Sequence, residues 1–578
     1  MGVKLKYSFE KIQFNQLAEK VILPKFQRSL VWSDDNKKTF IQTVLAGEPF
    51  GSLLLYKELG SEKFLIIDGL QRYTTLMDFK NDPYKYVDIK IEEYKELIDV
   101  VDYIYNKYND TLRETISDHV LTSFKLAVKK FYQSNNKYSS YISEQFIKEL
   151  SKRYEIEDLK SKIQLRIFDF WEKYSKDIDI TNLEIPVILY NGDMSELPNI
   201  FEKLNTGGTK LTKYEVFASS WNNVELRLLD NKVHKKILQN IEKRYEDLIE
   251  ETDISIEDYN EGDIISTGRV TLYEYVYGLS KEILNNNRNL LGKKRVSYAK
   301  DDSIGFSTLA TFLNLHLRDV GTLNRIINSN IEPANISNLS SIIMKMYEDI
   351  SKMLLPYINF NYKFIEAQII SIVHTWFRLN FEIDTSKIKI IPTSKYKHLH
   401  DDFKKFMPMR FLYDILNNTW SGAGDSTLFN MIRQNVEESS YLRPVNISSW
   451  ETKLNELVED QLLKPMRTIS NETKLLLSYI AKNNLKGDKY YKFDLVVPKK
   501  FVPKSQPISH LGNVFIHELP KVDKNKMIEE QNIEIKDIYF KPTKVNYTNY
   551  RILDEDLYEE MIKSRSIQII EYFKNIYL

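Results

Sequence analysis

Cysteine is absent from this sequence of 578 residues. Its absence excludes disulfide bonds, thiolate-ligated zinc and thiol catalysis, and it is compatible with a reducing cytosol. Long apolar runs are absent too. No stretch reaches the roughly 18 residues of a membrane-spanning helix, and the first residues, MGVKLKYSFEK, lack the apolar segment of a signal peptide. We expect a soluble, cytoplasmic protein with no membrane partner.

Net charge and several familiar catalytic motifs are also missing. Lysine plus arginine and aspartate plus glutamate each number 81, so no global field attracts the chain to nucleic acid. Any contact with DNA must therefore come from a local basic surface. The sequence contains no GxxxxGK[ST], HExxH or GxSxG motif, which excludes a P-loop, a zinc-protease helix and a nucleophile elbow.

The composition that remains is that of a globular protein, with 42% hydrophobic and 28% charged residues. At a typical size of roughly 100–200 residues per domain, the length suggests three or four domains, and we expect three, in an α+β multidomain chain. We place these domains at residues 1–225, 226–470 and 471–578.

The spacing of apolar residues predicts the content of each domain. Residues 51–69 contain two apolar runs that predict paired strands, and IPVILY at 185–190 predicts a third strand. Between them, from about 91 to 180, apolar residues recur every three or four positions, which predicts a helical insertion. The middle domain keeps this helical period. The last domain reads as a loop-rich module with the helix NETKLLLSYIAKNN, a short strand bounded by two prolines, and a helical tail.

The stretch FLIIDGLQRYTTL, residues 64–76, joins a predicted strand to polar residues in the first turn of a predicted helix. A helix N-terminus offers free backbone amides and a positive dipole end to an anion. Arg72 adds a planar fork for phosphate oxygens, and Asp68 could hold a divalent cation such as Mg²⁺ or orient a water. Together they predict a phosphate or nucleotide site. The alternative is that Asp68 caps the helix and Arg72 pairs with a surface carboxylate.

Four blocks of the sequence occur in a fixed order: PKFQRSLVW, AGEPFGSLLLY, IIDGLQRYTTL and FEKLNTGGTKLTKYE. Together they resemble the N-terminal domain of the GmrSD-type restriction proteins, a family often known by its DGQQR motif and related in fold to ParB and sulfiredoxin. The resemblance covers roughly the first 225 residues. One position departs from the motif, because Leu70 stands where the family has its first glutamine.

The resemblance implies a nucleotide-binding and often nucleotide-hydrolysing domain that serves bacterial defence against phage DNA. It implies catalytic roles for Asp68, Gln71 and Arg72. The residues that it implies for nucleotide binding are Gln27, Arg28, Gly69, Asn205, Gly207 and Gly208.

The C-terminal module carries a second resemblance, to the HNH-type nuclease domains of many members of this group. FDLVVPKKF at 493–501 and HLGNVFI at 510–516 are similar to the strand and to the Leu-Gly-Asn-Leu segment of those domains. The resemblance places Asp494 and Asn513 at the positions of a metal ligand and an orienting side chain. Leu495 stands where the family has its general-base histidine, and leucine can neither accept a proton nor activate water. We therefore expect a degenerate, HNH-like (ββα-metal-type) module.

Histidines leave further alternatives open. His510 and His517 could replace the missing base; otherwise His510 is a helix or loop cap and His517 a surface residue. His374, on an apolar helix, is expected in the core. His398 and His400 have the spacing that brings side chains to one face of a strand, and with the two aspartates that follow they could hold a metal.

Three functional hypotheses follow. The first is a bacterial anti-phage, type IV restriction-like protein that binds and hydrolyses an NTP at its DGxQR site, with Mg²⁺ as cofactor and turnover coupled to recognition of foreign DNA. The second is a nonenzymatic nucleotide- or DNA-sensing module that docks a partner nuclease. The third is a DNA-nicking nuclease that uses the N-terminal site. The protein could act with a partner nuclease or as a homo-oligomer.

Overall fold

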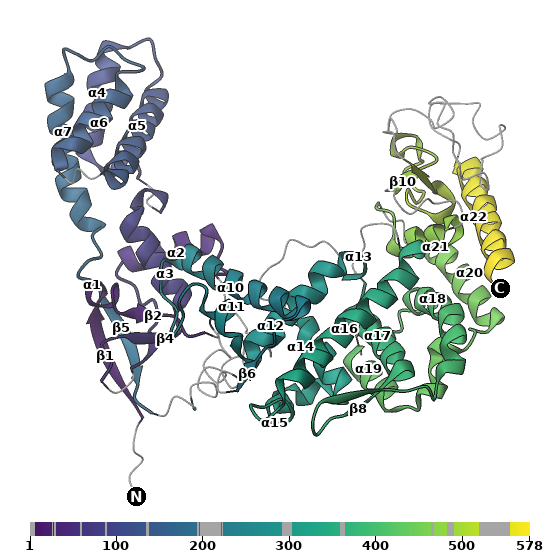
Figure 1. Ribbon diagram of the computed structural model, residues 1–578. Helices are drawn as coiled ribbons and strands as arrows, with labels where there is room; N and C mark the ends of the chain where they lie inside the picture. The colour runs from purple at the N-terminus through teal and green to yellow at the C-terminus, as the bar shows by residue number, and fades with distance from the viewer. Residues whose placement is uncertain are drawn as a thin grey trace, which may run out of the picture. The chain divides into compact units, whose positions relative to one another are not determined.

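Figure 1 shows the computed structural model of the chain. The structure describes residues 6–25, 27, 30–57, 60–86, 89–134, 138–192, 196, 221, 224–291, 303–358, 364–422, 424–463, 467–482, 491–518 and 555–578. The chain divides into two compact units, Met1–Leu211 with Arg244–Asn260 and Thr212–Lys243 with Glu261–Leu578. The three-domain division remains a prediction, since the segments 226–470 and 471–578 both fall mainly in the second unit.

A five-stranded mixed sheet lies at the centre of the first unit, in the order β1-β5-β3-β4-β2. Its strands are β1 (Tyr7–Gln13), β2 (Val21–Ile22), β3 (Leu53–Tyr56), β4 (Phe64–Asp68) and β5 (Glu184–Tyr190). β3 pairs antiparallel with β4 and parallel with β5, which confirms the three strands predicted here. β2 runs parallel to β4, so the two strands end at the same edge of the sheet.

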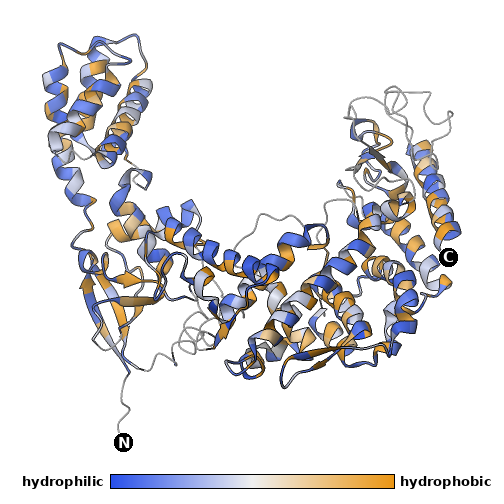
Figure 2. Cartoon of the chain, in the orientation of Figure 1, coloured by the Kyte–Doolittle hydropathy of each residue, from blue (hydrophilic) through white to orange (hydrophobic). Residues whose placement is uncertain are grey.

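Helices α1 (Phe14–Leu17) and α3 (Leu70–Asn81) contact strands β1 and β3, and α2 (Asp34–Leu45) packs against α3. The helices between α3 and β5, where the insertion was predicted, are α4 (Lys95–Lys107), α5 (Arg113–Gln133), α6 (Ser139–Leu150) and α7 (Lys160–Asp177). These four lie side by side in Figure 1, around ring contacts of Phe124 with Phe170 and Trp171. Figure 2 shows hydrophobic and hydrophilic stripes along them, as expected for amphipathic helices.

The second unit is mainly helical, as predicted. Its helices, after the first part of α10 (Lys232–Thr252), are α11 (Asp263–Thr267), α12 (Leu272–Asn286), α13 (Arg288–Leu291), α14 (Ser303–Phe312), α15 (Leu323–Ile326), α16 (Pro333–Leu354), α17 (Glu366–Asn380), α18 (His400–Leu416), α19 (Gly424–Arg433), α20 (Ile447–Leu463), α21 (Asn471–Ala481) and α22 (Glu555–Tyr577). Two short antiparallel pairs, β6 (Glu225–Arg227) with β7 (Arg269–Thr271) and β8 (Phe381–Asp384) with β9 (Lys389–Pro392), were not predicted. Within the described part of the chain, no helix combines the length and hydropathy needed to cross a membrane.

The C-terminal part of this unit contains two antiparallel strands and a helix. β10 (Tyr491–Leu495) pairs with β11 (Val514–Glu518), and α22 is the predicted helical tail. The expectation that two prolines bound the strand was wrong, because β10 ends before Pro498 and the residues between the prolines form a 3₁₀ turn. Beyond β10 the Val496 amide still donates to the Asn513 carbonyl, whereas Pro498 lacks the N–H that a longer ladder would need.

Gly512 determines how closely α22 approaches the loop before β11. A Cβ atom at Gly512 would lie 2.0 Å from the carbonyl oxygen of Ile562, so Gly512→Ala must displace the helix. We expect a loss of about 1–3 kcal/mol, seen as faster hydrogen exchange across α22. Gly424→Ala is the matched control, because its new Cβ would lie 3.4 Å from the nearest atom, the Cβ of Ala367. Equal exchange in both variants would contradict the close approach.

Candidate functional site

The strand-to-helix junction at Gly69 forms the centre of the candidate site. β4 ends at Asp68, and α3 begins one residue later, at Leu70. Gly69 makes this possible with a left-handed φ of +97°, where an L side chain is strained, and a Cβ there would lie 2.4 Å from Leu53 Cδ2. Gly69 is also the N-cap of α3 and has no side chain to bond the first-turn amides, so Asp68 is not the N-cap.

Arg72 and Asp68 form an ion pair across this junction. Arg72 Nη2 lies 2.8 Å from Asp68 Oδ2, and the side chains are 20% and 37% exposed. Arg72 thus pairs with a partly exposed carboxylate, as in the alternative interpretation, and this carboxylate is the motif aspartate itself. Gly51 makes room for the guanidinium, since a Cβ at that position would lie 2.5 Å from Arg72 Nη1. Gly51 was not among the predicted site residues.

Gln71 braces the loop that precedes α2. Its Oε1 accepts hydrogen bonds from the backbone amides of Val31 and Trp32, both at 3.0 Å. The side chain therefore fixes the loop of the PKFQRSLVW block against the first turn of α3. This contact gives Gln71 a positioning role in the structure, while its predicted catalytic role remains a prediction.

Gln27 lies in the same loop, beyond the end of β2. Its side chain is 5% exposed, and its Oε1 is buried without a hydrogen-bond partner. Burying an unsatisfied acceptor typically costs about 1–3 kcal/mol, so such an atom marks a place where a ligand donor or water could bind. The other predicted binding residues, Arg28, Asn205, Gly207 and Gly208, lie outside the described residues.

Residues 9–221 match the family model of the GmrSD restriction endonuclease, N-terminal domain. This part of the chain is a GmrSD-type domain. It includes the sheet, the inserted helices and the Asp68–Arg72 junction. The match supports a place for the protein among restriction proteins of antiviral defence, whereas the relation in fold to ParB and sulfiredoxin remains a prediction. No curated protein matches the chain.

Outside the GmrSD-type domain, the predicted HNH-like residues form part of a scaffold. The Asn513 side chain accepts from the Val497 amide at 2.7 Å and donates to the carbonyls of Val497 and Ile508 at 3.2 and 2.8 Å. Asp494 and Leu495 lie on β10, opposite Phe515 and Val514, and both are partly buried. Asn513 thus closes the loop between the two strands, and the HNH assignment itself remains a prediction.

His510 is a loop cap rather than an accessible base. It is fully buried, and its Nδ1 accepts from the Gly512 amide at 3.1 Å while its Nε2 faces the Val458 carbonyl at 3.3 Å. Burial lowers the pKa of His510 to about 4. The idea that His510 replaces the missing base is therefore wrong, because a base must reach a water from which it takes the proton. The side chain of His517 lies outside the described part.

Within the part of the chain that the structure describes, the remaining histidines belong to no metal-ligating cluster. His398 lies in a 3₁₀ turn and His400 begins α18, so the strand spacing assumed for them was wrong. His374 is in the core, as expected, between Phe312 and Phe377, and burial lowers its pKa to about 3. Among the described residues, no group of three or more His, Asp or Glu side chains could hold a metal ion.

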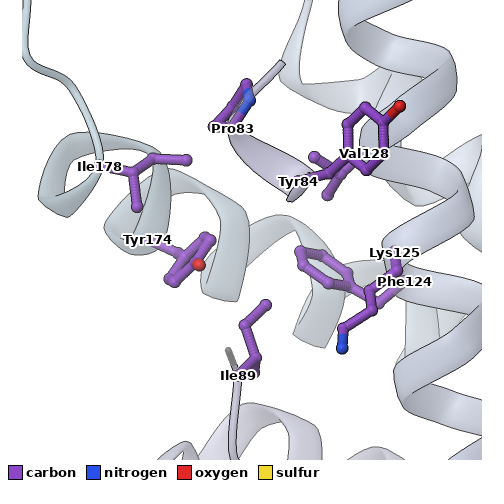
Figure 3. Close-up of a pocket in the computed structure, with 8 residues that line it drawn as sticks. All are labelled: Pro83, Tyr84, Ile89, Phe124, Lys125, Val128, Tyr174 and Ile178. Atoms are coloured by element: carbon purple, nitrogen blue, oxygen red, sulfur yellow. The ribbon is translucent and has the colours of Figure 1, made fainter. Parts of the chain in front are cut away.

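A small apolar hollow lies where the inserted helices join the domain (Figure 3). Its volume of about 10 Å³ holds roughly one water molecule. The residues that line it are Pro83, Tyr84, Ile89, Phe124, Lys125, Val128, Tyr174 and Ile178. None of them belongs to the predicted site, and the space is far too small for a nucleotide.

The buried His510 predicts a pH dependence that is local to the C-terminal module. An unfolded histidine binds its proton near pH 6.5, whereas folded His510 does so only near pH 4. The unfolded state therefore binds more protons between these values, and stability falls as the pH drops, by up to about 3 kcal/mol. We expect backbone amides of β11 and α22 to lose protection from hydrogen exchange between pH 7 and pH 5. In His510→Asn the same amides should lose less protection over this range. An identical pH response in this variant would contradict the assignment.

Proposed function

We propose that the GmrSD-type domain binds a nucleoside triphosphate at the start of α3 and that the protein uses this binding to restrict foreign DNA. The observation that carries the proposal is the left-handed start of α3 at Gly69 beside the Arg72 guanidinium. A helix start with no side-chain cap presents amide donors and a partial positive charge to phosphate oxygens. Arginine adds two parallel donors in the geometry that phosphate prefers.

The Asp68–Arg72 pair suits a site that exchanges partners when a ligand binds. The pair is only partly buried, so each group can turn to a new partner at moderate cost. Mg²⁺ takes oxygen ligands and is usually held by one or two carboxylates together with substrate phosphates. A nucleotide–Mg²⁺ complex would therefore draw Asp68 to the metal and leave Arg72 to the phosphates.

Asp68 is a single carboxylate, and this limits the chemistry that the site supports. Together with Mg²⁺ it could polarise a phosphoryl group or position the attacking water, which is the role expected in a nucleotide hydrolase. Most of the metal ligands would then come from the nucleotide and from water. A phosphodiesterase at the same site would rest on the same sparse set of groups, and we rank that activity lower.

A nonenzymatic sensor is the second candidate function, and the C-terminal module favours it. Leu495 supplies no base, and His510 is committed to the Gly512 amide. Cleavage of DNA would then fall to a partner nuclease, with nucleotide binding as the signal. The exposed Lys499, Lys500 and Lys504 could still contact a DNA backbone, because phosphate contact requires charge alone.

Nucleotide binding and phosphate release test the proposal directly. We expect wild-type protein with Mg²⁺ to bind at least one of ATP, GTP, CTP and UTP, with turnover measured in the presence and absence of DNA. Arg72→Ala should weaken binding by about 10- to 100-fold, the effect of losing charge-assisted hydrogen bonds of about 1.5–3 kcal/mol. Asp68→Asn should reduce the rate of phosphate release by a larger factor than it reduces nucleotide affinity.

Arg113→Ala is the matched control, because Arg113 forms an exposed 2.5 Å ion pair with Asp102 in the inserted helices. It should leave affinity unchanged. Binding without turnover in wild type would select the sensor. Absence of binding for all four nucleotides, or full affinity in Arg72→Ala, would overturn the site.

A further inference from the structure

A segment beyond the family match completes the first unit. The GmrSD-type match ends at residue 221, yet Arg244–Asn260 belongs to the same compact unit as the sheet. The Leu23 amide donates to the Ser255 carbonyl at 3.0 Å, and the Glu257 amide donates to the Leu23 carbonyl at 2.9 Å. Residues 255–257 thus lie alongside the end of β2, next to the loop that carries Gln27.

Arg244, in the second half of α10, holds that loop by its backbone. Its Nη1 donates to the Lys25 carbonyl at 3.1 Å and its Nη2 to the Gln27 carbonyl at 2.9 Å. The arginine is only 7% exposed. Burying a cation costs free energy unless its hydrogen-bond donors have acceptors, and the planar guanidinium donates to both carbonyls at once.

The far end of the loop is held from α10 and from α3. The Leu30 amide donates to Glu251 Oε2 at 3.4 Å, and the next two amides donate to Gln71. The loop is therefore fixed between the motif helix α3 and the segment outside the family match. Gln27, with its buried, unpartnered Oε1, lies within the part that is held on both sides.

We propose that Arg244 is a positioning residue of the nucleotide site: it fixes the backbone at Lys25 and Gln27 so that the Gln27 carboxamide oxygen accepts a hydrogen bond from an N–H or O–H donor of the nucleotide. The inference rests on the proposed function of the N-terminal site. It adds a residue that the family match does not cover and assigns an acceptor role to Gln27. The chemical class of the ligand is a nucleotide that brings a donor from its base or its ribose.

Three substitutions at two positions test this role. Arg244→Met removes both donors and should weaken nucleotide affinity at least tenfold, with Mg²⁺ and ATP, GTP, CTP or UTP as probes. Arg244→Lys keeps the charge without the planar fork and should give an intermediate loss. Gln27→Met removes the acceptor. Since Arg244 acts through Gln27, the double variant should lose little more than the worse single variant, as expected for coupled residues.

Two controls separate positioning from a general loss of stability. Lys243→Ala changes the exposed neighbour of Arg244 on the same helix and should leave affinity unchanged. Arg565→Met removes another buried arginine, which donates to the Val514 carbonyl at 3.0 Å in the C-terminal module, and should lower stability without lowering affinity. Thermal midpoints of all variants are measured alongside.

The outcomes are distinct. Wild-type affinity in Arg244→Met, strictly additive losses with Gln27→Met, or an equal loss in Arg565→Met would each overturn the inference while leaving the proposed function intact. If Arg244→Met does not fold, full affinity in Arg244→Lys together with full affinity in Gln27→Met overturns it. Absence of nucleotide binding in wild type would overturn the proposed function and the inference with it.

Discussion

The left-handed turn at Gly69 is the constraint on which the N-terminal site depends. Because this residue alone separates β4 from α3, the last strand residue and the first helical turn are brought together at the edge of the sheet. Asp68 and Arg72 then meet at 2.8 Å, and the first-turn amides of α3 begin beside them. A longer connection would move the carboxylate away from the helix start and loosen the pair. The backbone conformation thus determines which groups meet at this junction, and the side chains of Asp68 and Arg72 add charge to it.

The loop between β2 and α2 shows how one backbone segment is held by residues far apart in sequence. Gln71 of α3 accepts hydrogen bonds from the backbone at the end of the loop. Arg244 of α10 donates hydrogen bonds to the backbone at its beginning. The described residues between β2 and α2 belong to no strand or helix, so their backbone groups must find partners elsewhere or bond to water. The partners here come from two helices, α3 and α10. An acceptor placed on such a loop, like that of Gln27, keeps a fixed position without being part of a strand or helix.

Local sequence patterns predicted those parts of the N-terminal site that are formed by residues close together in the sequence. Apolar runs predicted β3, β4 and β5, and the Asp-Gly pair with an arginine one turn later predicted the strand-to-helix junction at which Asp68 and Arg72 meet. Arg244 gave no such signal, because its partners at Lys25 and Gln27 are 219 and 217 residues away. Gly51 was missed for the same reason, since only the fold brings the Arg72 guanidinium to it. The histidine pair at 398 and 400 failed because its spacing has meaning only on a strand, and the chain is helical there.

In the C-terminal module, two residues predicted for the HNH-like site, Asn513 and His510, form hydrogen bonds that hold the fold. The carboxamide oxygen and nitrogen of Asn513 both form hydrogen bonds within the loop before β11. His510 accepts a hydrogen bond from the Gly512 amide, and the lack of a side chain at Gly512 lets α22 approach. An imidazole that must stay neutral to accept this bond cannot also shuttle a proton to solvent. The module can therefore keep its strands and helix whether or not it cleaves anything, so its persistence is no argument for nuclease activity. In the N-terminal unit, by contrast, Arg72 and Asp68 are partly exposed and the Gln27 acceptor has no partner, so these groups remain open to ligand chemistry.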